Sequence, residues 1–175
     1  MSPRSTPTAE FGYGAGLLDP SRALQPGLVY DLDVQDYIGL LCSTQEYSDK
    51  LLQTMTGDKT ISCSSQHENI TTNDLNYPSF ALSVKDTNTV SGVFRRTLTN
   101  VGSPKSTYRA KVVAKEGLKI NVDPNELSFT ALGQNKSFVV TVEGPIEQST
   151  IISNSLVWDD GVYQVRSPIV VFLQL

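Results

Sequence analysis

The chain has 175 residues, a formal net charge of −4 and an apolar fraction of 39%. This length and composition predict one ordinary domain with a small appendage, and they exclude a chain that is disordered throughout. The 14 lysines and arginines are scattered, and no apolar run approaches the roughly 18 residues of a membrane span, so we expect neither nucleic-acid nor membrane partners.

The first 30 residues mix glycine, proline and isolated apolar side chains without a sustained period. Within them, EFGYGAG places glycines at 12, 14 and 16. A nucleotide-binding loop would need a preceding strand and G-x-G-x-x-G spacing. The preceding PRSTPTAE is unsuited to a central strand and the run is G-x-G-x-G, so we interpret it as a close-packed turn beside another backbone. Further on, Asp19 and Pro20 predict a single helical turn.

Two short helices are predicted after this Gly/Pro-rich segment. Asp33 is the expected N-cap of the first helix, because its carboxylate can accept from the free N–H groups of the opening turn. Apolar side chains then recur at helical spacing on one face: Val34, Tyr37, Ile38 and Leu41. Ser48 is the expected N-cap of the second helix, and Gly57 is its expected stop.

The two cysteines, Cys42 and Cys63, lie at the end of the first predicted helix and beyond the second. They follow neither a C-x-x-C pattern nor a four-ligand zinc pattern. A helix hairpin would bring the two thiols together, and a disulfide would close a loop of about 20 residues, which stabilises by about 3 kcal/mol in the chain-entropy model. The alternative is two free thiols in a reducing compartment.

From about Leu75 onward the residues alternate between apolar and polar, which is the period of a β-strand. Asp160 and Gly161 favour a tight hairpin before the last strand. Seven or eight short strands are predicted: 77–84, 93–101, 108–113, 118–122, 127–129, 136–142, 155–158 and 162–171. The expected fold is mostly β, an antiparallel sandwich of immunoglobulin-like or fibronectin III-like kind. Its expected core aromatics are Phe80, Phe94, Tyr108, Phe129, Phe138 and Trp158.

The sequence offers no catalytic constellation. Its one histidine, His67, lies in the polar stretch SSQHEN, and the chain has no G-x-S-x-G nucleophile motif. Asp31, Asp33 and Asp36 lack the spacing of a calcium loop, and helix capping explains Asp33 without a metal. We therefore expect no catalytic residue, no cofactor and no metal.

The sequence carries signals of two different compartments. N-x-S/T sequons occur at Asn69 and Asn135, in polar or turn-like surroundings where a glycan acceptor is expected. The opening MSPRSTPTAE, however, has no apolar core and is not expected to act as a signal peptide. Together these features predict a chain from a secreted protein that has lost its front end.

A series of motifs runs in order along the chain: EFGYGAG, PGLVYD, DYIGLLCS, TGD, LNYPSF, RTLTNVG, LSF, KSFVVTV and LVWDDGVYQVRSPIVV. In this order they resemble plant subtilisin-like serine proteases of the cucumisin-like group. The resemblance covers nearly the whole chain from about residue 9. LNYPSF, TNVG and the final W-x-D-G-x-x-x-V-R-S-P-I are specific in combination.

This resemblance implies that residues 1–30 are the tail end of a truncated catalytic domain, 31–72 a two-helix connector and 73–175 a fibronectin type III-like sandwich. It implies that Cys42 and Cys63 form a disulfide, and that the parent enzymes are secreted to the apoplast or cell wall and often glycosylated. The family's catalytic Asp, His and Ser all lie upstream, and no G-T-S-M motif is present. No catalytic residue therefore carries over to this chain.

The leading expectation is a non-catalytic module of a subtilisin-like serine endopeptidase that braces the catalytic domain and shapes substrate access. Its partner would be that catalytic domain, on the same chain in the parent. The alternative is a free-standing extracellular β-sandwich that binds other proteins. A hydrolase in its own right would depend on His67 alone.

Overall fold

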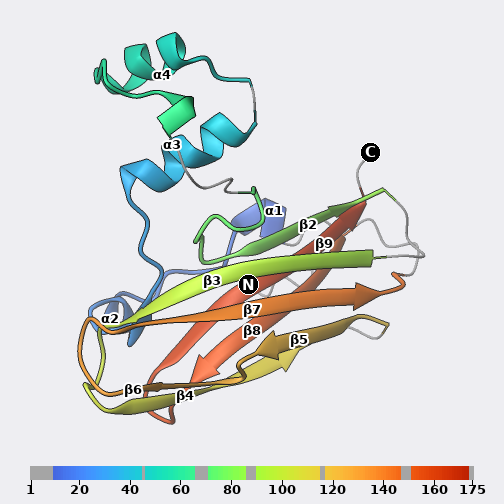
Figure 1. Cartoon of the computed structure of the whole chain (residues 1–175). Helices are drawn as coiled ribbons and strands as arrows, with labels where there is room; N and C mark the ends of the chain where they lie inside the picture. Colours follow the sequence, from blue (N-terminus) through green and yellow to red (C-terminus); the bar gives the residue numbers. More distant parts are fainter. Residues whose placement is uncertain are drawn as a thin grey trace.

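The chain forms a two-layer β-sandwich below a small helical unit, as the computed structural model in Figure 1 shows. The structure describes residues 10–44, 46–65, 71–85, 90–114, 117–146 and 151–173. His67 and the sequon residue Asn69 lie outside these ranges, so the expectations for both stay predictions.

The nine strands of the described residues form two sheets. The first sheet has the order β1-β3-β7-β5, with β1 at Leu28–Val29, β3 at Val90–Asn100, β7 at Asn135–Gly144 and β5 at Lys119–Asp123. The second has the order β2-β9-β8-β4-β6. Its strands are β2 at Phe80–Val84, β9 at Gln164–Leu173, β8 at Ile151–Asp159, β4 at Ser106–Val113 and β6 at Glu126–Phe129.

The predicted sandwich is confirmed, with one difference in strand direction. β2 pairs with β9 in parallel, from Phe80 opposite Ile169 to Val84 opposite Leu173, whereas the other strand pairs are antiparallel. The reason is that β2 and β3 follow each other in sequence but lie in different sheets, so β2 has no hairpin partner in its own sheet. Local alternation in the sequence does not carry this long-range pairing.

The core between the sheets is built from alternating strand residues and the six predicted aromatics. β3 shows the pattern most clearly, since every second residue from Val90 to Asn100 is buried. Phe80 packs edge-on against Phe94 at 5.4 Å between ring centroids, and Phe138 packs against Trp158 at 5.1 Å. Such pairs contribute about 0.5–1.5 kcal/mol beyond the apolar area that they bury.

The predicted capped helices are confirmed. α2, at Pro20–Ala23, is capped by Asp19, and α3, at Val34–Ser43, opens with a capping box between Asp33 and Asp36. α4, at Asp49–Thr56, is capped by Ser48 and ends at Gly57, whose φ of 76° is the left-handed conformation that favours glycine. A further short helix, α1, spans Glu10–Tyr13.

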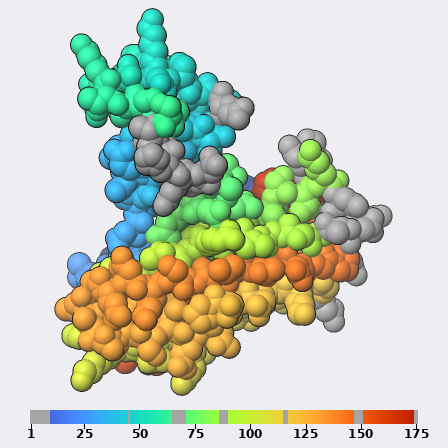
Figure 2. All heavy atoms as spheres, viewed as in Figure 1, coloured from blue at the N-terminus to red at the C-terminus, as the bar shows by residue number. Residues whose placement is uncertain are grey.

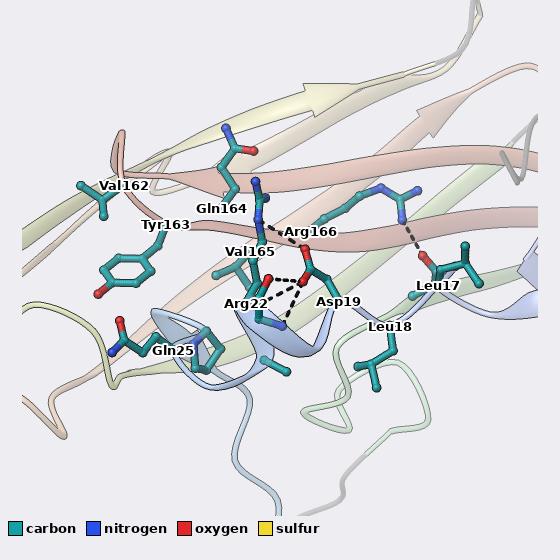
Figure 3. A pocket seen from close by; sticks show the side chains of 15 residues that line it. Leu17, Leu18, Asp19, Arg22, Gln25, Val162, Tyr163, Gln164, Val165 and Arg166 are labelled. Carbon is teal, nitrogen blue, oxygen red and sulfur yellow. Dashed lines mark hydrogen bonds and ion pairs between the residues drawn. The ribbon is translucent and has the colours of Figure 1, made fainter.

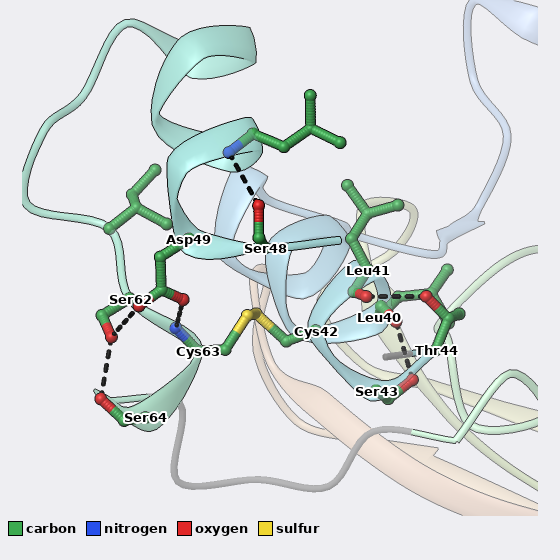
Figure 4. The surroundings of a disulfide bond; sticks show 12 residues. Leu40, Leu41, Cys42, Ser43, Thr44, Ser48, Asp49, Ser62, Cys63 and Ser64 are labelled. Carbon is green, nitrogen blue, oxygen red and sulfur yellow. Dashed lines mark hydrogen bonds between the residues drawn. A yellow bond between two sulfur atoms is a disulfide. The ribbon is translucent and has the colours of Figure 1, made fainter. Parts of the chain in front are cut away.

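α3 and α4 form a unit that projects from the sandwich (Figure 2). This unit has a very small core of its own. Its buried apolar side chains are Ile38, Leu52 and Ile61. The disulfide between Cys42 and Cys63, which the resemblance implies, is present beside this cluster, as Figure 4 shows. Val34 and Tyr37, two residues expected on the apolar face of the first helix, are exposed instead, and so are Leu51 and Met55 of α4.

Asp49 ties the segment that carries Cys63 to the start of α4. Its carboxylate accepts from the backbone N–H of Cys63 at 2.9 Å and from the hydroxyl of Ser62 at 2.9 Å (Figure 4). Both hydrogen bonds lower the pKa of Asp49, and the bond from the Cys63 N–H has the larger effect. Cys63 is therefore held at two points: its backbone N–H by the charged Asp49 carboxylate and its sulfur by the disulfide.

Removing the disulfide by the double change Cys42→Ala and Cys63→Ala is expected to unfold the helical unit and leave the sandwich folded. Three buried side chains are too few to hold two short helices together, and a disulfide of this span contributes about 3 kcal/mol. Amide exchange followed by mass spectrometry should show α3 and α4 losing protection while β3 and β7 keep it. Unchanged protection of α4 would contradict this role of the disulfide, and Ser64→Ala, a neighbouring exposed position, is the control.

Candidate functional site

The described residues hold no arrangement typical of a catalytic centre. They contain no group of three or more His, Cys, Asp or Glu side chains placed to bind a metal ion. Asp33 and Asp36 serve each other as helix caps. The expectation of no catalytic residue stays a prediction, because His67 is outside the described residues. No helix in the described part of the chain is long and apolar enough to cross a membrane.

Among the described residues, a densely hydrogen-bonded region is the junction where the N-terminal segment enters the sandwich. We define the junction as residues 27–31 together with two parts that contact them or hold them in place: the neighbouring residues of β3 and the segment 73–79. Leu28 and Val29 form β1 and pair with Asn100 and Thr99, so the entering chain becomes an edge strand of the first sheet. Leu28 is buried in the main core. The sequence predicts no strand here, because two residues are too few to show a period.

Gly27 lets the entering backbone lie directly against the sandwich. Its φ is 83°, and a Cβ there would lie 2.6 Å from the Cβ of Tyr163 and 2.9 Å from the hydroxyl oxygen of Tyr108. On the facing backbone, a Cβ on Gly102 would lie 3.0 Å from the Cα of Gly27. The Val101 N–H donates to the Gly27 carbonyl at 3.0 Å across this approach. The glycines of PGLVYD and TNVG are therefore needed to fit each other.

The glycine run of EFGYGAG behaves differently from its interpretation as a crowded turn. Gly14 and Gly16 have φ values of 59° and 110°, but a Cβ at either position would meet nothing within 4 Å. Within the described residues neither glycine is crowded, and the positive φ values favour glycine at both positions. The close approach that the interpretation anticipates occurs at Gly27 and Gly102 instead.

Asn76 of LNYPSF takes the place of a missing strand on the edge of β3. Its amide oxygen accepts from the Thr97 N–H at 2.8 Å, and its amide nitrogen donates to the Thr97 carbonyl at 2.9 Å. The same nitrogen donates to the Asp31 carbonyl at 2.9 Å. One side chain thus satisfies the edge of the sheet and holds the entering chain.

Arg96 is a buried arginine that fastens the segment before β2. Its side chain is 4% exposed and donates to the carbonyls of Asn73 at 2.5 Å, Tyr77 at 2.9 Å and Ser79 at 3.2 Å. The guanidinium carbon lies 4.8 Å from the ring centroid of Phe80, a cation–π distance. Burial lowers the pKa of Arg96 to about 10.

Tyr30 and Asp31 connect the junction to both sheets. The Tyr30 hydroxyl lies 2.8 Å from the hydroxyl of Ser167 on β9, and burial raises the pKa of Tyr30 to about 12. The hydroxyl of Thr99 on β3 donates to the Asp31 carboxylate, and its oxygen lies 2.9 Å from the Asn135 side-chain amide. The junction therefore joins the entering segment to the two layers of the sandwich at once.

Before the junction, the N-terminal segment carries large apolar side chains in water. A hollow of about 670 Å³ lies between residues 15–26 and the start of β9 (Figure 3). The Arg166 guanidinium donates to the Ala15 carbonyl at 3.2 Å across it. The most exposed leucines of the segment are Leu17 at 84%, Leu18 at 80% and Leu24 at 85%.

The fold and the junction define a fibronectin-type β-sandwich module whose entering segment is fixed to its edge strand. The fibronectin type-III domain model matches residues 74–171, and the chain belongs to this family. The match lies within the predicted sandwich region.

Over nearly its whole length the chain is also similar to plant subtilisin-like proteases. It is 46% identical to subtilisin-like protease SBT4.12 and 46% identical to subtilisin-like protease SBT4.6, both of Arabidopsis thaliana. These matches cover 98% and 96% of this chain but 24% and 23% of the relatives. The chain thus spans about a quarter of the length of these relatives and matches their C-terminal, non-catalytic region, which their catalytic domain precedes.

The sequence did not identify the residues of the junction as a site. Gly27, Asn76 and Arg96 all lie inside quoted motifs, namely PGLVYD, LNYPSF and RTLTNVG. The sequence signal for Arg96 is its charge, because Arg96 occupies a position where the alternation of β3 requires a buried side chain. The role of Asn76 depends on an approach of distant segments, which a single sequence does not display.

Gly27→Ala is expected to destabilise the chain more than Gly133→Ala. Both glycines have positive φ values, 83° and 73°, so both alanines carry the strain of a left-handed backbone, roughly 1 kcal/mol. Only the Cβ at 27 is crowded, which adds about 1–3 kcal/mol. Urea unfolding of the two variants measures the difference, and equal losses would show that the close approach of Gly27 is unimportant.

Tyr30→Phe is expected to remove part of the alkaline instability of the chain. The pKa of Tyr30 is about 12 in the folded state against 10.0 ordinarily, so the folded state favours the neutral phenol. Its contribution to stability is complete below pH 10 and is lost as the pH rises from 10 to 12. The unfolding free energy of the wild type, relative to that of Tyr30→Phe, should therefore fall as the pH rises across this window. Tyr77→Phe, at a half-exposed tyrosine, is the control, and a similar change in both variants would contradict the assignment.

Proposed function

We propose that the chain is the non-catalytic C-terminal module of a subtilisin-like serine endopeptidase, which braces the catalytic domain and shapes substrate access there. The observation that carries this proposal is the N-terminal segment. It is fixed to the sandwich at Gly27–Asp31 and leaves Leu17, Leu18 and Leu24 in water. In the relatives, a catalytic domain precedes this region in the sequence.

The physical basis of the bracing is the burial of these apolar side chains against the catalytic domain. Buried apolar surface contributes about 25 cal/mol per Å², so a moderate interface is a large share of the stability of an ordinary domain. Two further side chains extend the apolar surface: Phe11, which packs edge-on against Phe172 of β9, and Val162, which is 78% exposed. The module itself performs no hydrolysis in this proposal.

An extracellular location, in the apoplast or cell wall, belongs to the same proposal. The disulfide between Cys42 and Cys63 supports it, because such bonds persist in oxidising compartments. The sequons at Asn69 and Asn135 are consistent with the same route.

A chimeric protease tests the bracing role. The C-terminal quarter of subtilisin-like protease SBT4.12 is replaced by this chain, and Leu17, Leu18 and Leu24 are then changed to serine together. We expect the chimera to be active and the triple variant to lose about 3 kcal/mol or more of stability, since each leucine returns its buried surface to water. Thermal inactivation of the protease activity measures the loss.

The matched control changes exposed Val93 of β3 to serine in the same chimera. Because Val93 lies six residues, about 20 Å, along the strand from the pairing of Thr99 with β1, inactivation should be unaffected. Equal behaviour of the triple variant and the control would contradict the proposal.

An antibody against the sandwich gives a second test. A band near 19 kDa in the source tissue would favour the free-standing module, and a band about four times larger would favour the protease.

A further inference from the structure

The outward face of β3 and β7 carries a ladder of small polar side chains beside the junction. Thr97 pairs with Ser137 and Thr99 with Asn135 in the strand register. The two side-chain oxygens of each pair lie 2.9 Å apart. Because alternate residues of a strand share a face, these four side chains lie together on the side opposite the core.

This ladder is the floor of a polar hollow of about 430 Å³. Its walls come from the connector, through Asp31 and Asp36, and from Asp74 and Arg95. Carboxylate oxygens accept hydrogen bonds and the guanidinium donates them, so the hollow offers both kinds of partner. A ligand rich in hydroxyl groups matches this lining, because each hydroxyl donates and accepts.

Asn135 stands at this hollow and is also the acceptor residue of the sequon Asn135-Lys136-Ser137. It is exposed and begins β7 directly after a turn, where a modifying enzyme has access. Its side-chain amide lies 2.9 Å from the Thr99 hydroxyl oxygen, whose proton goes to the Asp31 carboxylate.

We propose that Asn135 carries an N-linked glycan whose first N-acetylglucosamine lies in this hollow and joins the connector to the β3–β7 face. In the transfer, the Asn135 amide nitrogen forms a bond to C1 of the sugar and loses one proton to a base of the transferase. The bond from C1 to the lipid pyrophosphate donor breaks, and the pyrophosphate keeps the electron pair. The proposal rests on the proposed secretory route.

The experiment uses the 175-residue chain behind a cleavable signal peptide in a eukaryotic host that attaches oligomannose glycans. Glycopeptide mapping should find Asn135 occupied in the wild type and in Ser137→Thr, which keeps the sequon, and unoccupied in Ser137→Ala. Asn69→Gln removes the other sequon and should leave Asn135 occupied. An unmodified Asn135 in the secreted wild type overturns the proposal.

The place of the sugar is tested on the folded Asn69→Gln protein, in which Asn135 is the remaining acceptor. Endoglycosidase H trims its glycan to one N-acetylglucosamine, whereas peptide N-glycosidase removes it and leaves aspartate. Amide exchange of residues 31–36 should be about fivefold slower in the trimmed form, the effect of one added hydrogen bond. The directly expressed Asn135→Asp variant should match the fully deglycosylated form.

Equal exchange of residues 31–36 in the trimmed and deglycosylated forms overturns the placement of the sugar in the hollow. These measurements need no catalytic domain, and the signal peptide imposes secretion. A failure here is therefore distinguishable from a failure of the bracing role or of the natural location.

Discussion

The contact of two backbones at Gly27 and Gly102 is the constraint on which the rest of the junction depends. With 3.0 Å between the position of a Gly102 Cβ and the Gly27 Cα, a side chain at 102 would push the entering chain outward. The hydrogen bond from Val101 to Gly27 and the pairing of β1 with β3 need that proximity. Tyr30 and Asp31 directly follow β1. The contacts of Tyr30 with β9 and of Asp31 with β3 therefore depend on the same placement of the entering chain.

The junction also solves the problem of an exposed strand edge. β1 covers two residues of β3, and an open edge invites pairing with other chains. The next outward positions along β3 are covered by side chains: the Asn76 amide at Thr97, and the Asp74 carboxylate at the Arg95 N–H. Arg96 holds the segment that carries both Asn76 and Asp74, through three of its carbonyls. The buried guanidinium of Arg96 thus serves edge protection through hydrogen bonds to backbone carbonyls.

Local patterns in the sequence predict most of the elements, and they fail where distant segments meet. The caps at Asp19, Asp33 and Ser48 and the alternation in β3 and β7 are properties of neighbouring residues, so the sequence displays them. The parallel pairing of β2 with β9, the strand β1 and the role of Arg96 depend on residues more than 15 positions apart. The resemblance supplies the cysteine pairing, but the motifs alone do not say what their residues contact.

The position of β9 has a consequence for how the module is made. The last strand of the chain lies inside its sheet, between β2 and β8, rather than at an edge. During synthesis the residues of β9 leave the ribosome after those of the other strands described above, and until then β2 has no neighbour in its sheet. The sandwich therefore closes only once β9 has emerged, and any premature stop before residue 164 removes an interior strand of the sheet.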